Sequence, residues 1–442
     1  MSRYKNYLLS AAAAAILAVT PSLSSAEVTV LGWPGGPEEV ALRSVVELYN
    51  AKSSVTEENK VELIFFSREG FYDKLQADLA AGTDAFDASL LATYSIGRYA
   101  PYMKPITLSD EAEDVFGASV LTTMQFEGKQ YGVPTDLSLH FLYYRTDLIE
   151  ALLNDKEQYD KYSDISEQYL GVRLTPKDPD SWTWQDFAAN ALYFTKSVNP
   201  DSPTRYGTVL QLKNLLFNMM VFHSLPRSYG GNWMDENGNI TVDSEAYRAA
   251  LNLFKILVDA GATPKDSFSY EYAEANAAFG AGQVAAMIQW NAAAADLMDP
   301  AKTPVTAETT KTIAPPAGPE GRFTHTHGLG LGVNASGKNV EGAEAFVRFL
   351  STAEAAKAYA LAGGAPGLTS SVVADIADER PDLVLLGEYA SNYGFVMNGG
   401  TAAKALSVYE LQAKEFTGFL SGGQTLDEAL ANTEAGMAEL LK

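Results

Sequence analysis

The sequence predicts an α/β fold in which parallel strands are joined by helices. Three short apolar segments, at residues 27–31, 61–66 and 86–91, have the length of buried strands. Between them lie two segments with helical periodicity, at residues 38–50 and 71–82. Strands that alternate with helices are joined by right-handed crossovers and pair in parallel. This order therefore predicts a parallel sheet at the start of the chain.

Each of these elements has its own signal. The strands read EVTVL, VELIFF and FDASLL. The apolar residues of the first helix recur at the spacing of one helix face, at Leu42, Val45, Val46 and Tyr49. Those of the second helix do the same before Gly82 ends it, at Phe71, Leu75 and Leu79.

The middle and the end of the chain are predicted to be mainly helical. Thr183 with Asp186 forms a variant of the capping box, and Trp184 inside it is therefore interpreted as a packing residue. Three further helices follow, at residues 244–260, after the capping box at 351–354, and after the capping box at 425–428.

The composition excludes several classes of function. The chain has 442 residues, 47% of them hydrophobic, so it can bury a large core in two or three domains. It has no cysteine, which excludes disulfides, thiolate metal sites, a cysteine nucleophile and lipid attachment through an N-terminal cysteine. Its formal charge of -23 repels phosphate backbones, so we expect no nucleic-acid partner.

The first 26 residues have the pattern of a signal peptide. Arg3 and Lys5 precede an apolar run, and small residues follow it at Ser24 and Ala26. The alternative is a membrane anchor, but the run is too short and too rich in alanine to span a bilayer well. We expect cleavage after Ala26 and export to a bacterial periplasm, without a lipid anchor.

The expected sheet also predicts where a ligand would bind. In open α/β sheets, ligands bind beyond the carboxyl ends of the strands. The segments at those ends are Trp33 with the turn 34–36, Ser67 to Glu69, and Thr93 with Tyr94. Trp33 lies within GWPGGP and is hard to assign to a core, so it is a candidate binding aromatic. Arg68 is interpreted as a solvated surface residue, unless the ligand is an anion that recruits it.

The segment THTHGLGLGV, residues 324–333, combines two histidines with three glycines. His325 and His327 would share one face of a strand, a spacing that can chelate zinc. Zinc needs three or four ligands, and the other histidines, His140 and His223, have no ligand-like spacing around them. The glycines do not match a phosphate loop. We therefore expect no metal and no cofactor, but a strand whose glycines permit close backbone approach, with His327 at its entrance as a hydrogen-bond donor.

The chain contains no motif of a nucleophilic hydrolase or a kinase. A glycosidase needs only two carboxylates a few ångströms apart, which 55 acidic residues always permit. The sequence therefore neither supports nor excludes a carbohydrate-cleaving enzyme.

Aromatic and amide residues recur in segments with loop character. The turn-rich loop 229–239 carries Asn232 and Trp233, and a short apolar run within 285–294 ends at Trp290. Neutral sugars have apolar ring faces and hydroxyl rims, so their sites combine aromatic surfaces with polar side chains. The residues that would meet this need are Trp33, Tyr94, Trp233, Trp290, Asp136 and Asn232.

Several segments together resemble one protein family. The resemblance lies, in chain order, in residues 131–149, 230–261, 278–292 and 328–359. They resemble segments of the bacterial extracellular solute-binding proteins of family 1, the maltose-binding-like sugar type that serves ABC importers. Arg145 departs from the pattern, because the family more often has asparagine there, and we assign it no ligand role.

The resemblance implies a two-lobed α/β fold of the periplasmic-binding-protein type (type II-like), with the ligand cleft between the lobes and three hinge crossings. The expected lobe one comprises residues 27–136 and 313–363, and lobe two comprises residues 137–312 and 364–442. The implied ligand contacts are Trp33, Ser67, Glu69, Tyr94, Asp136, Trp233, Trp290, His327, Gly364 and Ala365, to which the loop adds Asn232.

The expected function is capture of a sugar or oligosaccharide and its delivery to the permease subunits of an ABC importer, without bond making or breaking, by a monomer. Two alternatives stay open. The same scaffold could bind a non-neutral solute, such as a sugar phosphate, a sulfonated sugar or a polyamine. The second alternative is a secreted carbohydrate hydrolase or lyase.

Overall fold

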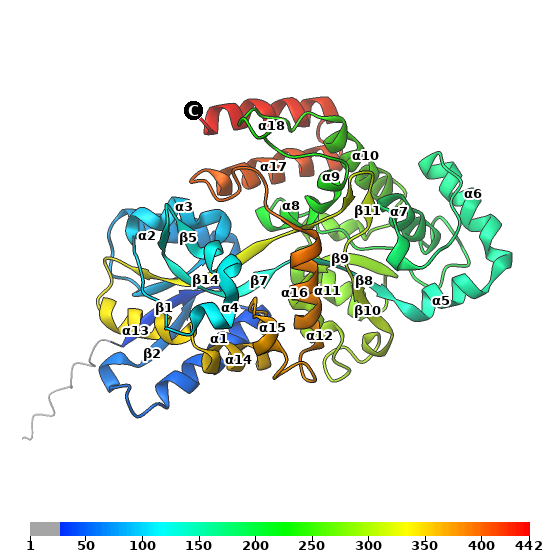
Figure 1. Ribbon diagram of the computed structural model, residues 1–442. Helices are drawn as coiled ribbons and strands as arrows, with labels where there is room; N and C mark the ends of the chain where they lie inside the picture. Colours follow the sequence, from blue (N-terminus) through cyan, green and yellow to red (C-terminus); the bar gives the residue numbers. More distant parts are fainter. Residues whose placement is uncertain (1–26) are drawn as a thin grey trace, which may run out of the picture.

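The computed structural model describes residues 27–442. The expected leader, residues 1–26, lies outside these described residues. The chain forms a mixed α/β fold of two lobes, each built around its own sheet (Figure 1). We call them the large-sheet lobe, at the left of Figure 1, and the small-sheet lobe, at its right. The α/β class predicted from the sequence is confirmed.

The large sheet has the strand order β2-β1-β3-β14-β4, and β7 pairs with β14 as well. Its strands are β1 (Val28–Gly32), β2 (Val61–Phe65), β3 (Ala88–Ala92), β4 (Met103–Lys104), β7 (Gly132–Ser138) and β14 (His327–Asn334). Strand β1 pairs in parallel with β2 and β3, as the strand and helix order predicted. Strand β14 runs antiparallel to β3, β4 and β7.

Helices flank this sheet, and the first two of them lie at the positions that the periodicity predicted. They are α1 (Gly36–Asn50), α2 (Phe71–Ala80), α3 (Ile96–Tyr99), α4 (Ala112–Leu121), α13 (Val340–Leu350) and α14 (Ala353–Leu361), and a small hairpin is formed by β5 (Gln125–Phe126) and β6 (Lys129–Gln130). The predicted apolar face of α1 is buried in full, at Leu42, Val45, Val46 and Tyr49.

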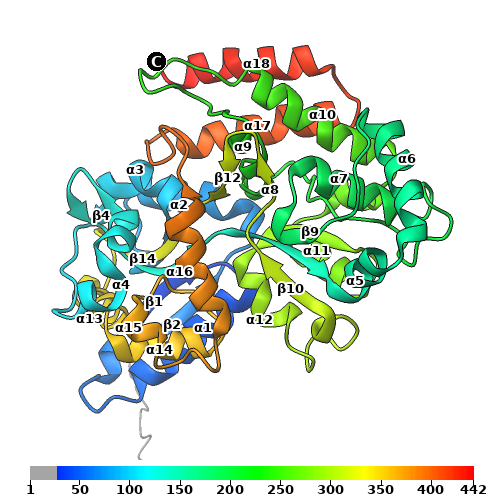
Figure 2. The same ribbon diagram turned by 45° about the vertical axis from the view of Figure 1, so that its right-hand side comes forward.

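The small sheet is antiparallel and has the order β10-β8-β9. Its strands are β8 (His140–Arg145), β9 (Ala286–Trp290) and β10 (Thr310–Ile313). The helices around it are α5 (Thr146–Asn154), α6 (Tyr159–Leu170), α7 (Trp184–Tyr193), α8 (Leu216–Phe222), α9 (Ser224–Ser228), α10 (Glu245–Asp259), α11 (Tyr272–Gly280), α12 (Ala294–Leu297), α17 (Ala405–Leu420) and α18 (Leu426–Leu440). Figure 2 shows α17 and α18 lying over α10 at one end of the molecule.

The chain passes between the lobes at three places. The first is Leu139, between β7 and β8. The second joins β10 to β14 through β11 (Ala317–Gly318), β12 (Gly321–Arg322) and β13 (Thr324–His325). The third follows α14 and includes α15 (Ser370–Val373), α16 (Pro381–Tyr393) and β15 (Gly394–Phe395), which pairs with β13. Helix α16 lies at the junction of the two lobes in both views (Figures 1 and 2).

The glycines of β14 permit the close packing that the sequence predicted. A Cβ atom on Gly330 would lie 2.3 Å from the carbonyl oxygen of Val133, and one on Gly332 would lie 2.5 Å from Leu91 Cδ1. Both distances are far below van der Waals contact, so only glycine lets β14 lie this close to its neighbours.

The predicted helix starts differ from the structure at one place. The boxes at Thr183 with Asp186 and at Thr425 with Glu428 are both formed. Helix α14, however, is capped by Thr352, whose side chain accepts from the backbone N–H of Ala355. The neighbouring Ser351 bonds instead to Ser109, so the predicted box at 351–354 is wrong by one residue. Within residues 27–442, no helix has both the length and the apolar character needed to cross a membrane.

Candidate functional site

A cavity lies between the two lobes, where several strands of both sheets end. The empty space in it, part of which is open to solvent, is about 440 Å³. The residues that line it are Trp33, Glu38, Arg68, Tyr94, Ser138, Phe217, Tyr272, Trp290, Ala292, His327 and Leu329. Trp33 directly follows the end of β1, and Tyr94 comes two residues after the end of β3, as expected for a ligand site in an open α/β sheet. His327 begins β14, which is antiparallel to β3, so it lies at the same edge.

A glycine turn directs the chain from β1 into this cavity. Gly35 and Gly36 have φ values of 85° and 82°, which side chains with a Cβ rarely adopt. The turn starts α1 at once and places Glu38 in its first turn, where the helix dipole favours a negative charge. A Cβ on Gly36 would lie 2.4 Å from Glu38 Oε2, so the glycine also makes room for the carboxylate.

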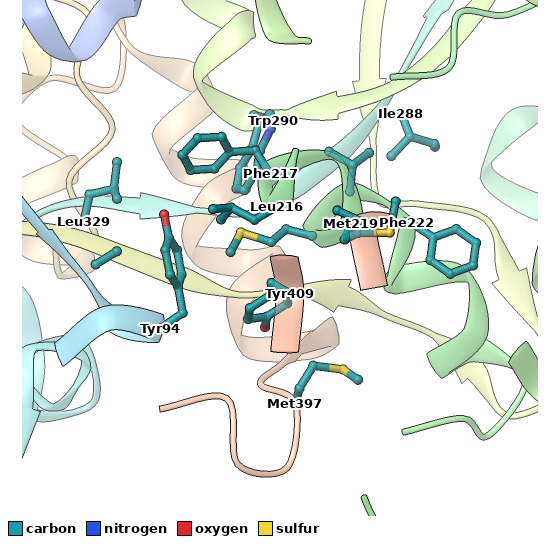
Figure 3. Close-up of a cluster of buried hydrophobic side chains, with 14 of the residues drawn as sticks. Tyr94, Leu216, Phe217, Met219, Phe222, Ile288, Trp290, Leu329, Met397 and Tyr409 are labelled. Carbon is teal, nitrogen blue, oxygen red and sulfur yellow. The ribbon is translucent and has the colours of Figure 1, made fainter. Parts of the chain in front are cut away.

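Aromatic rings from both lobes form the walls. Trp33 packs edge-on against Phe71 of its own lobe, at a ring distance of 5.1 Å, and against Phe217 of the small-sheet lobe, at 5.8 Å. Trp290, the last residue of β9, lies 5.8 Å from the His327 ring. Figure 3 shows Tyr94, Phe217 and Trp290 in one cluster, although they belong to three different elements.

The two lobes touch around the cavity, so the structure is a closed form. The Arg68 guanidinium lies 3.3 Å from the Glu271 carboxylate of the small-sheet lobe. It also stacks over the rings of Trp33 and Phe217, at 4.9 Å from each centroid. The side chain is only 22% exposed, so the interpretation of Arg68 as a solvated surface residue is wrong. Its burial depends on the small-sheet lobe, which sequence spacing does not reveal.

Five lining side chains hold a buried polar atom that has no hydrogen-bond partner among residues 27–442. These atoms are Trp33 Nε1, Glu38 Oε2, Arg68 Nε, Tyr272 Oη and Trp290 Nε1. Leaving one such group without a partner costs about 1–3 kcal/mol, so proteins seldom bury several together. Three N–H donors, a hydroxyl and a carboxylate oxygen on the residues around an aromatic cavity are suited to a molecule with several hydroxyl groups.

The charges in the cavity largely compensate one another. Burial and the nearby Asp136 carboxyl together raise the pKa of Glu38 to about 7, against the lowering effect of Arg68. Burial disfavours the charge on Arg68, but the carboxylates Glu271 and Glu38 outweigh it and raise its pKa, so it stays a cation. A neutral ligand therefore meets no large uncompensated charge in the cavity.

Of the residues predicted from the sequence, the structure brings Trp33, Tyr94, Trp290 and His327 together at this cavity. Each is at least nine-tenths buried. The Tyr94 hydroxyl is hydrogen-bonded to that of Tyr72 at 2.8 Å, which fixes the ring. These four come from β14 and from the ends of β1, β3 and β9, which meet where the lobes face each other.

Two of the other predicted residues flank the cavity without lining it. Ser67 is exposed at the end of β2. Glu69 is also exposed, and its carboxylate accepts from the Lys213 ammonium of the small-sheet lobe at 3.1 Å. Both belong to the loop that carries Arg68. The strand-end rule therefore selected a loop that reaches the cavity, but the residue of this loop that lines the cavity is Arg68.

Asp136, Gly364 and Ala365 form a buried group behind the cavity. Asp136 accepts from the Tyr359 hydroxyl and, at 2.8 Å, from the backbone N–H of Ala365. Burial raises the pKa of Asp136, and these hydrogen bonds oppose the shift. The carbonyl oxygen of Gly364 accepts from Arg380. Their contacts are with the protein itself.

Gly364 therefore has a testable packing role. A Cβ at this position would lie 2.0 Å from Cε1 of the buried Tyr359 ring. We expect Gly364→Ala to displace Tyr359 and to lower the free energy of unfolding by about 1–3 kcal/mol, as overpacked cores do. Urea unfolding would measure the loss. Gly387→Ala is the matched control, because its Cβ would meet no atom within 4 Å. Equal stability of the two variants would contradict the packing role.

Asn232 and Trp233 lie away from the cavity. The Trp233 indole is 1% exposed, packs on Tyr409 at 4.7 Å and donates its N–H to the carbonyl oxygen of Asn398. Asn232 Oδ1 accepts from the backbone N–H groups of Trp233 and Asn398. The hydrogen bonds to Asn398 connect the loop 229–239 to the segment that follows β15.

The structure also adds lining residues that the sequence did not indicate. Glu38 could have been found from the sequence, because it lies in the first turn of the helix that follows the first strand. Phe217 and Tyr272 lie on α8 and α11 of the small-sheet lobe, where no strand-end rule applies. Only the tertiary fold brings them to the cavity.

The four histidines of the chain gather beside the cavity. The ring distances are 4.0 Å between His325 and His327, 5.4 Å between His223 and His325, and 6.4 Å between His140 and His327. His140 and His223 are therefore not isolated, although their spacing suggested it. Among the described residues, no group of three or more histidine, aspartate or glutamate side chains is arranged to hold a metal ion.

Known proteins share this architecture. A relative named lactose-binding protein, from Rhizobium radiobacter, is 33% identical over 143 residues, which cover 31% of this chain and 33% of the relative. Relatives from Brucella abortus, named only as binding proteins, are 25% identical over 219 residues, or 49% of this chain and 46% of theirs. The chain thus spans about a third of the length of the lactose-binding relative and about half of that of the Brucella abortus relatives.

Solved structures match over nearly the full chain. The maltose-bound MalE3 of T. maritima has a TM-score of 0.78 at 20% identity and covers 94% of this chain and 100% of its own. An ABC transporter solute-binding protein of Agrobacterium radiobacter K84, in complex with ribitol, has a TM-score of 0.76 at 17% identity, covering 95% and 99%. These likenesses show the two-lobed fold. The family model described as bacterial extracellular solute-binding protein matches residues 40–357, well over half of the chain. The chain belongs to this family of bacterial extracellular solute-binding proteins.

Proposed function

We propose that the chain is the substrate-binding component of an ABC importer, which captures a sugar or oligosaccharide between its lobes and delivers it to the permease. The observation that carries this proposal is the closed cavity, which is rich in aromatic rings and whose lining residues hold five buried polar atoms without partners. Aromatic faces suit the apolar faces of a sugar, and the polar atoms suit its hydroxyl rim. The names of the lactose-binding relative and of the maltose-bound and ribitol-bound neighbours support the same class of ligand.

We propose a neutral ligand rather than a sugar phosphate, a sulfonated sugar or a polyamine. An anion would need an unpaired cation, but Arg68 is already paired with Glu271. A polyamine would need several ionised carboxylates, whereas Glu38, which lines the cavity, has a pKa raised to about 7 by burial. The ligand contacts that we assign are Trp33, Glu38, Arg68, Tyr94, Trp290 and His327.

The mechanism is a shift between an open and a closed arrangement of the lobes. Opening must break the contacts of Arg68 with Glu271 and with Phe217. A ligand that touches both lobes binds the closed arrangement better and so shifts the population towards it. The closed surface is then what the permease recognises. The chain makes and breaks no bond in this cycle.

The remaining features of the proposal come from the sequence. We place lobe one at residues 27–136 and 313–363, and lobe two at residues 137–312 and 364–442. We propose that the protein acts as a monomer in the periplasm, after removal of residues 1–26.

A thermal-shift screen of residues 27–442 with sugars, polyols, sugar phosphates and polyamines tests the proposal. A ligand at a hundred times its Kd stabilises the folded state by about 2.7 kcal/mol, which is readily seen as a raised Tm. We expect neutral sugars or polyols to give the shift and the charged solutes to give none. Incubation with oligosaccharides, followed by chromatography, tests for a hydrolase or lyase. Released products, or a shift with charged solutes alone, would refute the proposal.

A further inference from the structure

The cavity is closed at one end by a wall that both lobes build. Arg68 comes from the large-sheet lobe and lies between the rings of Trp33 and Phe217, at 4.9 Å from each. Its guanidinium reaches Glu271 of the small-sheet lobe at 3.3 Å. Stacking and ion pairing hold the planar group in one position. A ligand in the cavity meets this wall and does not extend past it.

A second hollow lies on the other side of Arg68. The empty space in it, part of which is open to solvent, is about 570 Å³, and Arg68 lines both spaces. The other residues that line the second hollow include the acidic Glu69, Asp73 and Glu410. The two spaces together would accommodate a chain of sugar rings, but Arg68 divides them.

Another part of the cavity wall consists of packed rings. Tyr94 and His327 lie edge-to-face at 5.4 Å, and Tyr94 also contacts Tyr409 of the small-sheet lobe at 6.0 Å. Trp290 covers His140 at 4.4 Å. The rings contact one another directly, so a second sugar ring cannot pass between them without moving the lobes apart.

Polar atoms lie at the Arg68 end. Glu38 Oε2 and Arg68 Nε are both buried without a partner, one as an acceptor and one as a donor. A diol on adjacent carbons can donate to the carboxylate and accept from the guanidinium at the same time. The two indole N–H groups, of Trp33 and Trp290, can donate to further hydroxyls.

We propose that the ligand is a compact polyhydroxylated molecule, one sugar ring or a linear polyol, that Glu38 and Arg68 bind its hydroxyls, and that the Arg68 wall excludes oligosaccharides. This inference rests on the proposed function and narrows it. It makes Glu38 and Arg68 the residues that determine the preference for compact ligands over oligosaccharides.

Isothermal titration calorimetry of residues 27–442 tests this, with D-glucose, D-galactose, ribitol and D-mannitol as compact probes and maltose, lactose and maltotriose as extended ones. We expect one of the compact probes to bind and the extended probes to bind at least tenfold more weakly. Glu38→Ala should weaken the compact probe roughly ten- to a hundredfold, because it removes a buried hydrogen-bond acceptor. Arg68→Ala should also weaken the binding of the compact probe. It should reduce the difference in affinity between maltose and the compact probe, because the two hollows then join.

Two variants serve as matched controls. Glu47→Ala removes an exposed carboxylate from the same helix, and Arg43→Ala removes an arginine that is 53% exposed. Both should keep the affinity and the size preference of the unaltered protein. The Tm of each ligand-free variant checks that it is folded. If Arg68→Ala fails to fold, Arg68→Met replaces it, since methionine retains the apolar contact with the two rings.

The outcomes separate the two proposals. Tighter binding of maltose or maltotriose than of every compact probe would overturn this inference but leave a sugar importer in place. Unchanged affinity in Glu38→Ala would overturn the role of Glu38 alone. Binding of no neutral sugar or polyol at all would overturn the proposed function together with the inference.

Discussion

Replacing Trp290 with alanine is expected to weaken sugar or polyol binding at least tenfold. Trp290 is the last residue of β9, is 9% exposed, and presents an indole N–H without a partner to the cavity. Loss of its stacking surface costs on the order of 1–2 kcal/mol of binding energy, and a tenfold change in Kd corresponds to about 1.4 kcal/mol. Loss of the indole N–H donor further reduces the binding energy.

Calorimetry on Trp290→Ala and Trp290→Phe separates the two contributions. Phenylalanine retains a ring but not the N–H, so its affinity should lie between those of the unaltered protein and the alanine variant. Truncating a buried tryptophan also destabilises the fold by about 3–5 kcal/mol, so stability needs its own control. Trp184→Phe, in the core of the small-sheet lobe at 1% exposure, should lower the Tm without changing the Kd. An unaltered Kd in Trp290→Ala would show that the cavity is not the binding site.

The sequence predicted the large sheet well because its signals are local. The strands that end at Gly32 and Ala92 are short apolar runs, and the helices between them have a clear apolar face. The rule that ligands bind beyond strand ends depends only on this local order, and it led to Trp33 and Tyr94. The structure places both in the cavity.

The rest of the site depends on contacts between distant segments. Asn232 and Trp233 lie in a loop with the composition of a binding loop, but the neighbouring Asp235 accepts from the backbone N–H groups of Asn237 and Asn239 and so forms a local turn. The segment near Asn398 then covers Trp233. No local pattern records which segment covers a side chain, and the same limit applies to Phe217, which meets Trp33 only when the lobes close.

Acidification is expected to destabilise the protein through its four histidines. All four are at most 3% exposed. Burial lowers the pKa of His223 to about 3, and burial with mutual repulsion lowers the pKa of His140, His325 and His327 well below 6.5. The hydrogen bonds of the cluster are to neutral groups, His325 with Tyr409 and His223 with Gln412, so no carboxylate stabilises a protonated ring.

The sign follows from proton binding. A histidine in the unfolded chain titrates near pH 6.5, whereas these histidines stay neutral in the folded state. The unfolded state therefore binds more protons below pH 6.5, and stability falls by up to about 1.4 kcal/mol per pH unit for each histidine. Glu38, Asp136 and Glu410 act in the opposite direction, because burial raises their pKa values and the folded state binds protons first as the pH falls. Four histidines outnumber three carboxyls, so a net loss of stability is expected between pH 6.5 and pH 5.

Urea unfolding of the ligand-free protein at pH 7, 6 and 5 would measure this loss. His140→Leu tests its origin, because both ring nitrogens of His140 are buried without a partner and the leucine cannot titrate. The difference in unfolding free energy between this variant and the unaltered protein should change by about 2 kcal/mol from pH 7 to pH 5, in favour of the variant. Phe222→Leu, a buried substitution beside His223 that removes no titratable group, should shift stability equally at every pH. If the difference in unfolding free energy for His140→Leu is the same at pH 7 and pH 5, His140 binds a proton as readily in the folded state as in the unfolded one. Its burial in this cluster would then not account for the loss of stability in acid.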